Sequence, residues 1–408
     1  MPTPLHIFLL QIIVILIASR VFAWLCKKIG QPAVIGETVA GIILGPSLIS
    51  TTFPSFAGFV FPKPSLGNLQ MVSQVGLILF MFVIGMELDI NIIRRKARSA
   101  VVISITSIVL PFALGAGLAY YLYNSFAPKD VPLHAFALFM GIAMSITAFP
   151  VLARIIRERG ITNTKSGVLA LTSAAMDDVT GWCLLAFVIA IAKSNGINHS
   201  FYTLAEAVAY VLVMFLAVKP LLKRIKTNEN NTVKQSTIAI VFILLLASAF
   251  TSEAIGIHAL FGAFLVGIIM PVEWELRKLI INKIEDVSLI LLLPIFFVLT
   301  GLRTQIGLLN DPSLWGTCLI IIAVAITGKF GGSFIAAKLS GEGTYESLAI
   351  GTMMNTRGLM ELIILNIGYD LGILTPQIFT MMVLMALITT FLTSPVLNLL
   401  NKIYKREG

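Results

Sequence analysis

Charge is scarce in this chain. Only 12% of its 408 residues are Asp, Glu, Lys or Arg, whereas 57% are hydrophobic. Soluble domains carry about 25% charged residues, so this composition excludes an ordinary water-soluble fold. Long apolar runs separated by short polar segments instead predict an all-α polytopic membrane protein.

Residues that build other kinds of site are also rare. The three cysteines (Cys26, Cys183 and Cys318) have no paired spacing, and the four histidines are scattered. That pattern argues against disulfides and against a thiolate or imidazole metal centre. Phosphate-binding and dinucleotide-binding sequences are absent as well, so an ATP-driven pump is unsupported. We therefore expect no cofactor and no enzymatic activity. We also expect no nucleic-acid partner, because the net charge of +9 comes from basic residues that lie between apolar runs.

The apolar runs predict about thirteen transmembrane helices and no soluble region longer than a loop, so residues 1–408 form one transmembrane domain. The expected spans are 5–25, 31–50, 66–90, 99–126, 131–158, 166–192, 201–222, 235–252, 255–271, 286–308, 313–337, 344–369 and 376–400.

Basic residues predict the orientation of these spans. Of the basic residues near span ends, 21 fall on one side of the membrane and 4 on the other. The first side includes clusters such as Arg94-Arg95-Lys96, and the second has Lys63, Lys129, Lys193 and Arg303. Because basic loops stay in the cytoplasm, the N-terminus is expected outside the cell membrane and the C-terminus inside.

An odd number of spans allows two inverted six-helix repeats joined by the seventh span. Under that plan the fifth and twelfth spans correspond, and both carry helix-breaking sequence. Ser145, Thr147 and Pro150 interrupt the fifth, and Asn355 and Thr356 interrupt the twelfth. Broken helices are tolerated in a membrane only where they line a cavity. We therefore expect two crossing discontinuous helices beside the sixth span.

The sixth span carries Asp177 and Asp178, with eleven uncharged residues before them back to Lys165 and fourteen after them up to Lys193. This places both carboxylates near the middle of the bilayer, where an ionisable group costs several kcal/mol unless a partner or an ion compensates it. The pair is the candidate cation- and proton-binding site, with a purely structural salt bridge as the alternative.

Consecutive helical residues point about 100° apart, so one aspartate can face an ion while the other meets a partner. Lys329 is the natural partner, because seventeen uncharged residues separate it from Asp311 and eight separate it from Lys338. It is either a structural pin or a proton carrier. Arg357 and Glu361 are four residues apart and form a self-neutralising structural pair, an interpretation at least as good as direct ion binding.

These residues lie in segments that resemble the monovalent cation:proton antiporter superfamily, in the branch of Kef-type and Nap-type bacterial transporters. The matching segments are QPAVIGETVAGIILGP (31–46), GLILFMFVIGMELD (76–89), SITAFPVLARIIRERG (145–160), TSAAMDDVTGW (172–182), ITGKFGGS (326–333) and NTRGLMELIILN (355–366).

The resemblance implies a homodimer in which the broken helices and the acidic helix form a mobile core. It implies that Asp178 is the ion-carrying carboxylate and that Lys329 pairs with Asp177. The Asp-Asp pair is typical of sodium exchangers, whereas the flanking sequence is closer to Kef-type and plant-type potassium exchangers, so the cation is Na⁺ or K⁺. Kef-type proteins have a cytoplasmic nucleotide-binding domain, which is missing after Lys405-Arg406-Glu407-Gly408, so we expect no gating through it.

The resemblance predicts an electrogenic secondary antiporter that exchanges Na⁺ or K⁺ for H⁺. The alternative is a Kef-type gated K⁺ efflux system, which would need a continuous pore. An intramembrane aspartyl protease is disfavoured, because two adjacent aspartates on one helix diverge instead of facing each other.

Overall fold

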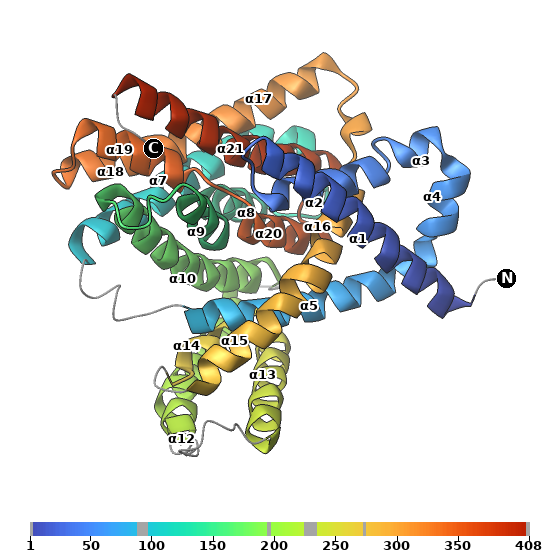
Figure 1. The fold of residues 1–408 in the computed structure, drawn as a ribbon, viewed down its shortest axis with the longest axis horizontal. Coiled ribbons are helices and arrows are strands. Elements are labelled where there is room, and N and C mark those ends of the chain that lie inside the picture. The colour runs from blue at the N-terminus through green and yellow to red at the C-terminus, as the bar shows by residue number, and fades with distance from the viewer. Residues whose placement is uncertain (1–2, 88–96, 194–196, 224–234, 272–274, 405–408) are drawn as a thin grey trace. The chain divides into compact units, whose positions relative to one another are not determined.

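The structure is a computed structural model that describes residues 3–87, 97–193, 197–223, 235–271 and 275–404. The described chain is helical, with short connecting segments and no strand (Figure 1). Twelve helical segments in it are long and apolar enough to cross a membrane, and Ala259–Ile269 is a shorter apolar helix. The expectation of about thirteen helices is confirmed, with the ninth shorter than a full span. Several basic residues of the orientation argument, including Arg94-Arg95-Lys96 and Lys405, lie outside the described residues.

The first half of the described chain contains these α-helices: α1 (Pro4–Lys28), α2 (Ala33–Leu44), α3 (Ile49–Thr52), α4 (Pro54–Val60), α5 (Leu66–Glu87), α7 (Ala97–Phe126), α8 (Leu133–Ser145), α9 (Phe149–Glu158) and α10 (Lys165–Lys193). The second half contains α11 (Ile197–Val213), α12 (Lys219–Lys223), α13 (Gln235–Ile255), α14 (Ala259–Ile269), α15 (Glu275–Val287), α16 (Leu293–Arg303), α17 (Pro312–Ile326), α18 (Gly332–Leu339), α19 (Thr344–Met354), α20 (Leu359–Asp370) and α21 (Pro376–Ile403).

Three π-helical segments continue some of these helices: η2 (Met214–Val218), η3 (Ser288–Leu292) and η5 (Thr327–Gly331). Short 3₁₀ turns lie at η1 (Lys63–Ser65) and η4 (Ile306–Leu308).

The chain divides into two compact units. The first comprises Met1–Leu66, Asn91–Gly181 and Phe297–Gly408, and the second comprises Gly67–Ile90 and Trp182–Phe296. All candidate site residues belong to the first unit.

Two spans of the first unit are broken, as the sequence predicts. Helix α8 ends at Ser145 and α9 begins at Phe149, with Ile146 and Ala148 extended between them. Pro150 explains this break, because its ring disfavours helical backbone before it. Helix α19 ends at Met354 and α20 begins at Leu359. The two breaks meet, because the Ala148 N–H donates to the Thr356 carbonyl at 3.1 Å.

Gly358 sets the second break. Its φ of 154° lies in a region that side chains rarely adopt, and a Cβ at this position would lie 2.9 Å from Val151 Cγ2. The glycine therefore allows the chain to turn between α19 and α20 while it lies against α9.

Small side chains pack the helices of the first unit closely around these breaks. The shared apolar core draws on α7, α9, α10, α18, α19 and α21, and alanine is its commonest residue: Ala100, Ile103, Leu152, Ile156, Leu169, Ala170, Ala174, Ala336, Ala337, Ala349, Ile350, Met353, Met354 and Leu397. Small residues let helix backbones approach in a lipid environment. This packing fixes where α10 presents its aspartates.

Candidate functional site

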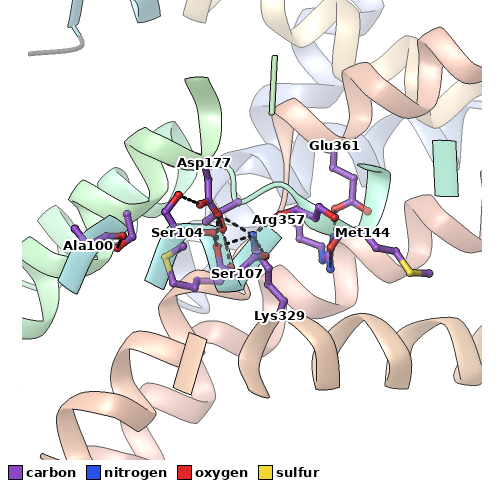
Figure 2. Close-up of polar contacts among 12 residues, drawn as sticks. Ala100, Ser104, Ser107, Met144, Asp177, Lys329, Arg357 and Glu361 are labelled. Carbon is purple, nitrogen blue, oxygen red and sulfur yellow. Dashed lines mark hydrogen bonds and ion pairs between the residues drawn. The ribbon is translucent and has the colours of Figure 1, made fainter. Parts of the chain in front are cut away.

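Asp177 is saturated with hydrogen-bond donors. Its Oδ1 accepts from Ser104 Oγ at 2.7 Å, and its Oδ2 accepts from Ser107 Oγ at 2.7 Å and Thr147 Oγ1 at 2.9 Å. The Lys329 ammonium completes the set at 2.8 Å from Oδ2 (Figure 2). The aspartate and the lysine are both fully buried. Three hydroxyls and one cation therefore compensate a carboxylate that would otherwise be costly at this depth.

Lys329 is held equally well. Besides Asp177, its Nζ donates to the Ser107 carbonyl oxygen at 2.9 Å and to the Ser145 carbonyl oxygen. An ammonium has three protons, and these three acceptors use all of them. The lysine lies in η5, a π-helical segment of a kind that often marks functional sites.

Asp178 is in the opposite condition. It is fully buried, yet neither of its carboxylate oxygens accepts a hydrogen bond from the described chain. The backbone N–H of Phe149 approaches this carboxylate without the geometry of a full hydrogen bond. Phe149 is the first residue of α9, so Asp178 faces the positive end of a half-helix. A buried carboxylate of this kind needs a proton or a cation.

No side chain caps the N-terminus of α9. Its N-cap residue is Ala148, which has no side-chain oxygen, and Pro150 has no N–H to offer. The open helix end and the unpartnered Asp178 therefore lie together at the first break.

Arg357 stabilises the same break from the other broken span. Its guanidinium donates to the carbonyl oxygens of Ala143 at 3.1 Å and Met144 at 2.8 Å, in the last turn of α8. It also pairs with Glu361 at 3.2 Å (Figure 2). The carbonyls of a helix C-terminus lack partners in their own helix, so Arg357 caps α8 while Glu361 balances its charge.

Thr390 of α21 performs the matching task at the second break. Its hydroxyl accepts from the Arg357 backbone N–H at 2.9 Å and donates to the Arg357 carbonyl oxygen at 2.7 Å. Thr147 Oγ1 also lies 3.0 Å from the carbonyl oxygen of Met354, the last residue of α19, so its single proton is shared between this carbonyl and Asp177. Backbone groups freed by both breaks thus find partners on neighbouring elements.

The structure brings most of the predicted site residues together, with two differences in role. Ser145 contributes its carbonyl rather than its hydroxyl, which donates to Gly141 in its own helix at 2.6 Å. Asn355 lies at the C-terminal end of α19, nearly buried, and its side-chain oxygen has no described partner. Pro150 shapes the backbone and Thr147 binds Asp177.

Ser104, Ser107 and Thr390 are site residues that the sequence analysis did not identify. Two hydroxyls three residues apart on one helix, as at Ser104 and Ser107 in an apolar span, are the signal that could have found the first two.

With both aspartates and Lys329 ionised, two negative charges and one positive charge leave the cluster at −1. Among the described residues, no three His, Cys, Asp or Glu side chains gather to hold a metal ion. The available ligand is the unpartnered carboxylate of Asp178, which a proton or an alkali cation can neutralise.

Comparisons with known proteins agree on one family. Residues 13–400 match the family model described as sodium/hydrogen exchanger, transmembrane. The chain is 42% identical over 403 residues to the Na⁺/H⁺ antiporter NhaS4 of Synechocystis, covering 98% of both proteins. It is 34% identical over 417 residues to K⁺/H⁺ antiporter 1 of Saccharomyces cerevisiae, and the match covers the whole chain but 48% of that relative.

Its fold is similar to the solved structure of the sodium proton antiporter MjNhaP1 from Methanocaldococcus jannaschii, with a TM-score of 0.71, 17% identity and 97% coverage of both chains. The named relatives are transporters and give no support to the alternative of a Kef-type efflux system.

Proposed function

This chain belongs to the sodium/hydrogen exchanger family, and from that premise we propose that it is a secondary antiporter that exchanges Na⁺ or K⁺ for H⁺. Alternating access would expose the buried aspartate site to one side of the membrane at a time.

The contrast between the two aspartates carries this proposal. Asp177 has four donors, including Lys329, so an incoming cation would have to displace protein ligands there. Asp178 has no described hydrogen-bond partner and the same complete burial. We therefore assign Asp178 as the carboxylate that carries the ion, with Asp177 as its charged neighbour and the support for Lys329.

Coupling follows from this single unpartnered carboxylate. Asp178 can be neutralised by a proton or by a cation, and each occupant excludes the other. Crossing the bilayer with neither bound would carry a buried uncompensated charge, which is costly. Only the proton-loaded and cation-loaded forms then cross readily, so the two fluxes oppose each other.

The names of the relatives support both candidate cations, because one is a Na⁺/H⁺ antiporter and another a K⁺/H⁺ antiporter. The site itself, a carboxylate beside a half-helix end, suits either ion. Cation choice is therefore an outcome of the experiment below.

The test is flux in proteoliposomes loaded with a pH-sensitive dye, with Li⁺, Na⁺ and K⁺ added in parallel. In an antiporter, cation uptake saturates and requires protons to move in the opposite direction. An efflux channel conducts the cation without proton movement. The exposed N-cap variant Asp311→Asn is the matched control, because it removes a carboxylate outside the buried cluster. Cation flux without proton flux would overturn the proposal.

We also propose that the protein is a homodimer in the cell membrane, with its N-terminus outside and its C-terminus in the cytoplasm. The 21 to 4 division of basic residues supports the orientation. Single cysteines placed at Lys63 and Lys402 in a cysteine-free background should react with impermeant reagents from opposite sides. Mass measurement in detergent checks the dimer.

A further inference from the structure

Pro111 lies inside α7, which continues unbroken from Ala97 to Phe126. A proline in a helix has no N–H, so the carbonyl four residues earlier loses its partner. That carbonyl belongs to Ser107, and it accepts a hydrogen bond from Lys329 Nζ at 2.9 Å. The lysine therefore supplies a hydrogen-bond donor to the carbonyl that the proline cannot serve.

Pro395 in α21 gives a second instance in which a side chain donates to the carbonyl that a proline frees. The carbonyl four residues before it belongs to Phe391, and the Gln31 side-chain amide donates to it at 3.1 Å. Membrane helices tolerate proline where neighbours re-satisfy the freed backbone in this way. At Pro395 the replacement donor is neutral, whereas at Pro111 it is the ammonium of the ion site.

The segment that carries Lys329 is adapted to the same contact. Among the three π-helical segments of the described chain, η2 and η3 are each followed two residues later by a proline, Pro220 or Pro294. No proline follows η5 closely; instead it contains Gly328, where a Cβ would lie 2.8 Å from Pro111 Cα and 2.9 Å from Pro111 Cβ. The glycine allows η5 to lie against α7 at the proline.

We propose that Pro111 is a positioning residue for the ion site: by freeing the Ser107 carbonyl, and with Gly328 allowing close approach, it holds the Lys329 ammonium on Asp177 and leaves Asp178 open. Lys329 then has two backbone acceptors: the Ser107 carbonyl, which Pro111 frees, and the Ser145 carbonyl, which belongs to the last residue of α8. This inference rests on the antiport proposed above.

The first experiment is a thermal-stability cycle that requires no transport. In the Lys329→Gln background, Pro111→Ala should raise the melting temperature or leave it unchanged, because alanine has a higher helix propensity than proline. With Lys329 present, the same change returns the Ser107 carbonyl to its helix and weakens support of the ammonium. We expect the two effects to differ by at least about 2 °C. Equal effects in both backgrounds would overturn the contact.

Two matched controls separate this role from general helix effects. Pro395→Ala should change stability equally in the wild-type and Lys329→Gln backgrounds, because its freed carbonyl binds Gln31. Gly331→Ala alters the same π-helical segment at a position with open space, whereas Gly328→Ala would push against Pro111. If Pro111→Ala fails to fold, Lys329→Gln should restore folding in the double variant, and a failure of that rescue overturns the inference.

The second experiment measures exchange against pH for the wild type, Pro111→Ala and Pro395→Ala. A less firmly held ammonium changes the electrostatics of the aspartate pair, so the pH profile of Pro111→Ala should move by about one pH unit from that of the wild type. Pro395→Ala should keep the wild-type profile. A stability coupling without this shift would reduce Pro111 to a structural role and overturn the positioning claim. Absence of exchange in the wild type would instead contradict the proposed function.

Discussion

Lys329 binds Asp177 at 2.8 Å, and no described hydrogen bond reaches the carboxylate of Asp178, the next residue in the chain. The two side chains share full burial and the same helix, so their difference comes from direction alone. One aspartate faces α7 and η5, which carry Ser104, Ser107 and Lys329. The other faces the open end of α9.

Asp178→Asn should abolish exchange and leave stability unchanged or higher. An amide cannot titrate or offer a full charge to a dehydrated cation, and no described hydrogen bond is lost. Isotope flux and thermal melting measure the two effects, with Asp311→Asn as the control. Pre-steady-state cation uptake at wild-type level in Asp178→Asn would refute the assignment.

Asp177→Asn should destabilise the protein by about 3–5 kcal/mol, because it leaves the Lys329 ammonium buried without its countercharge. Lys329→Gln should recover part of that loss in the double variant. A double-mutant cycle on melting temperature checks the coupling. Strictly additive losses would show that the 2.8 Å pair contributes nothing specific.

The sequence predicts the spans, both breaks and the acidic pair because each depends on local composition: long apolar runs, Pro150, and two charges far from any loop. The partner of Lys329 could not be chosen by counting residues, since either aspartate was within reach along the helix. The resemblance to known antiporters indicated Asp177, and the structure places the lysine there.

Ser104, Ser107 and Thr390 were missed for a physical reason. A hydroxyl in an apolar helix commonly bonds a carbonyl of its own preceding turn, as Thr389 does with Met385. Which hydroxyls turn to another helix depends on packing between segments distant in sequence. The same holds for the contact between Lys329 and the Ser107 carbonyl that Pro111 frees, because these two residues lie 222 positions apart in the sequence.

Thr390→Val should destabilise the protein by about 1–3 kcal/mol for each backbone group that it leaves unpaired at Arg357. Thr390→Ser keeps the hydroxyl and should restore stability. The neighbouring Thr389→Val is the matched control, because that hydroxyl bonds only within α21 in the described structure. Equal losses for the two valine variants would show that the Arg357 contacts are unimportant.

The apparent KM for the cation should rise as pH falls, while the rate at saturating cation stays constant. Proton and cation compete for Asp178, so each unit of acidification below the titration range raises the apparent KM for the cation about tenfold. Initial rates over a grid of cation concentration and pH measure this directly. A KM that is independent of pH would mean that the two ions bind different groups.

Membrane potential should drive the exchange, because the charges in the cluster do not cancel through the cycle. With Asp177, Asp178 and Lys329 ionised the cluster carries −1, which one monovalent cation neutralises. If Lys329 releases its proton as the cation binds and regains it on the return step while Asp178 takes another, two protons move per cation. Each net charge is then worth about 2.3 kcal/mol per 100 mV. If Lys329 is a permanent pin, only Asp178 titrates and exchange is one for one.

Electrophysiology on a solid-supported membrane should show a transient current after a cation jump, in protein already shown to exchange by isotope flux. No current in such protein would establish the electroneutral cycle and assign Lys329 a structural role.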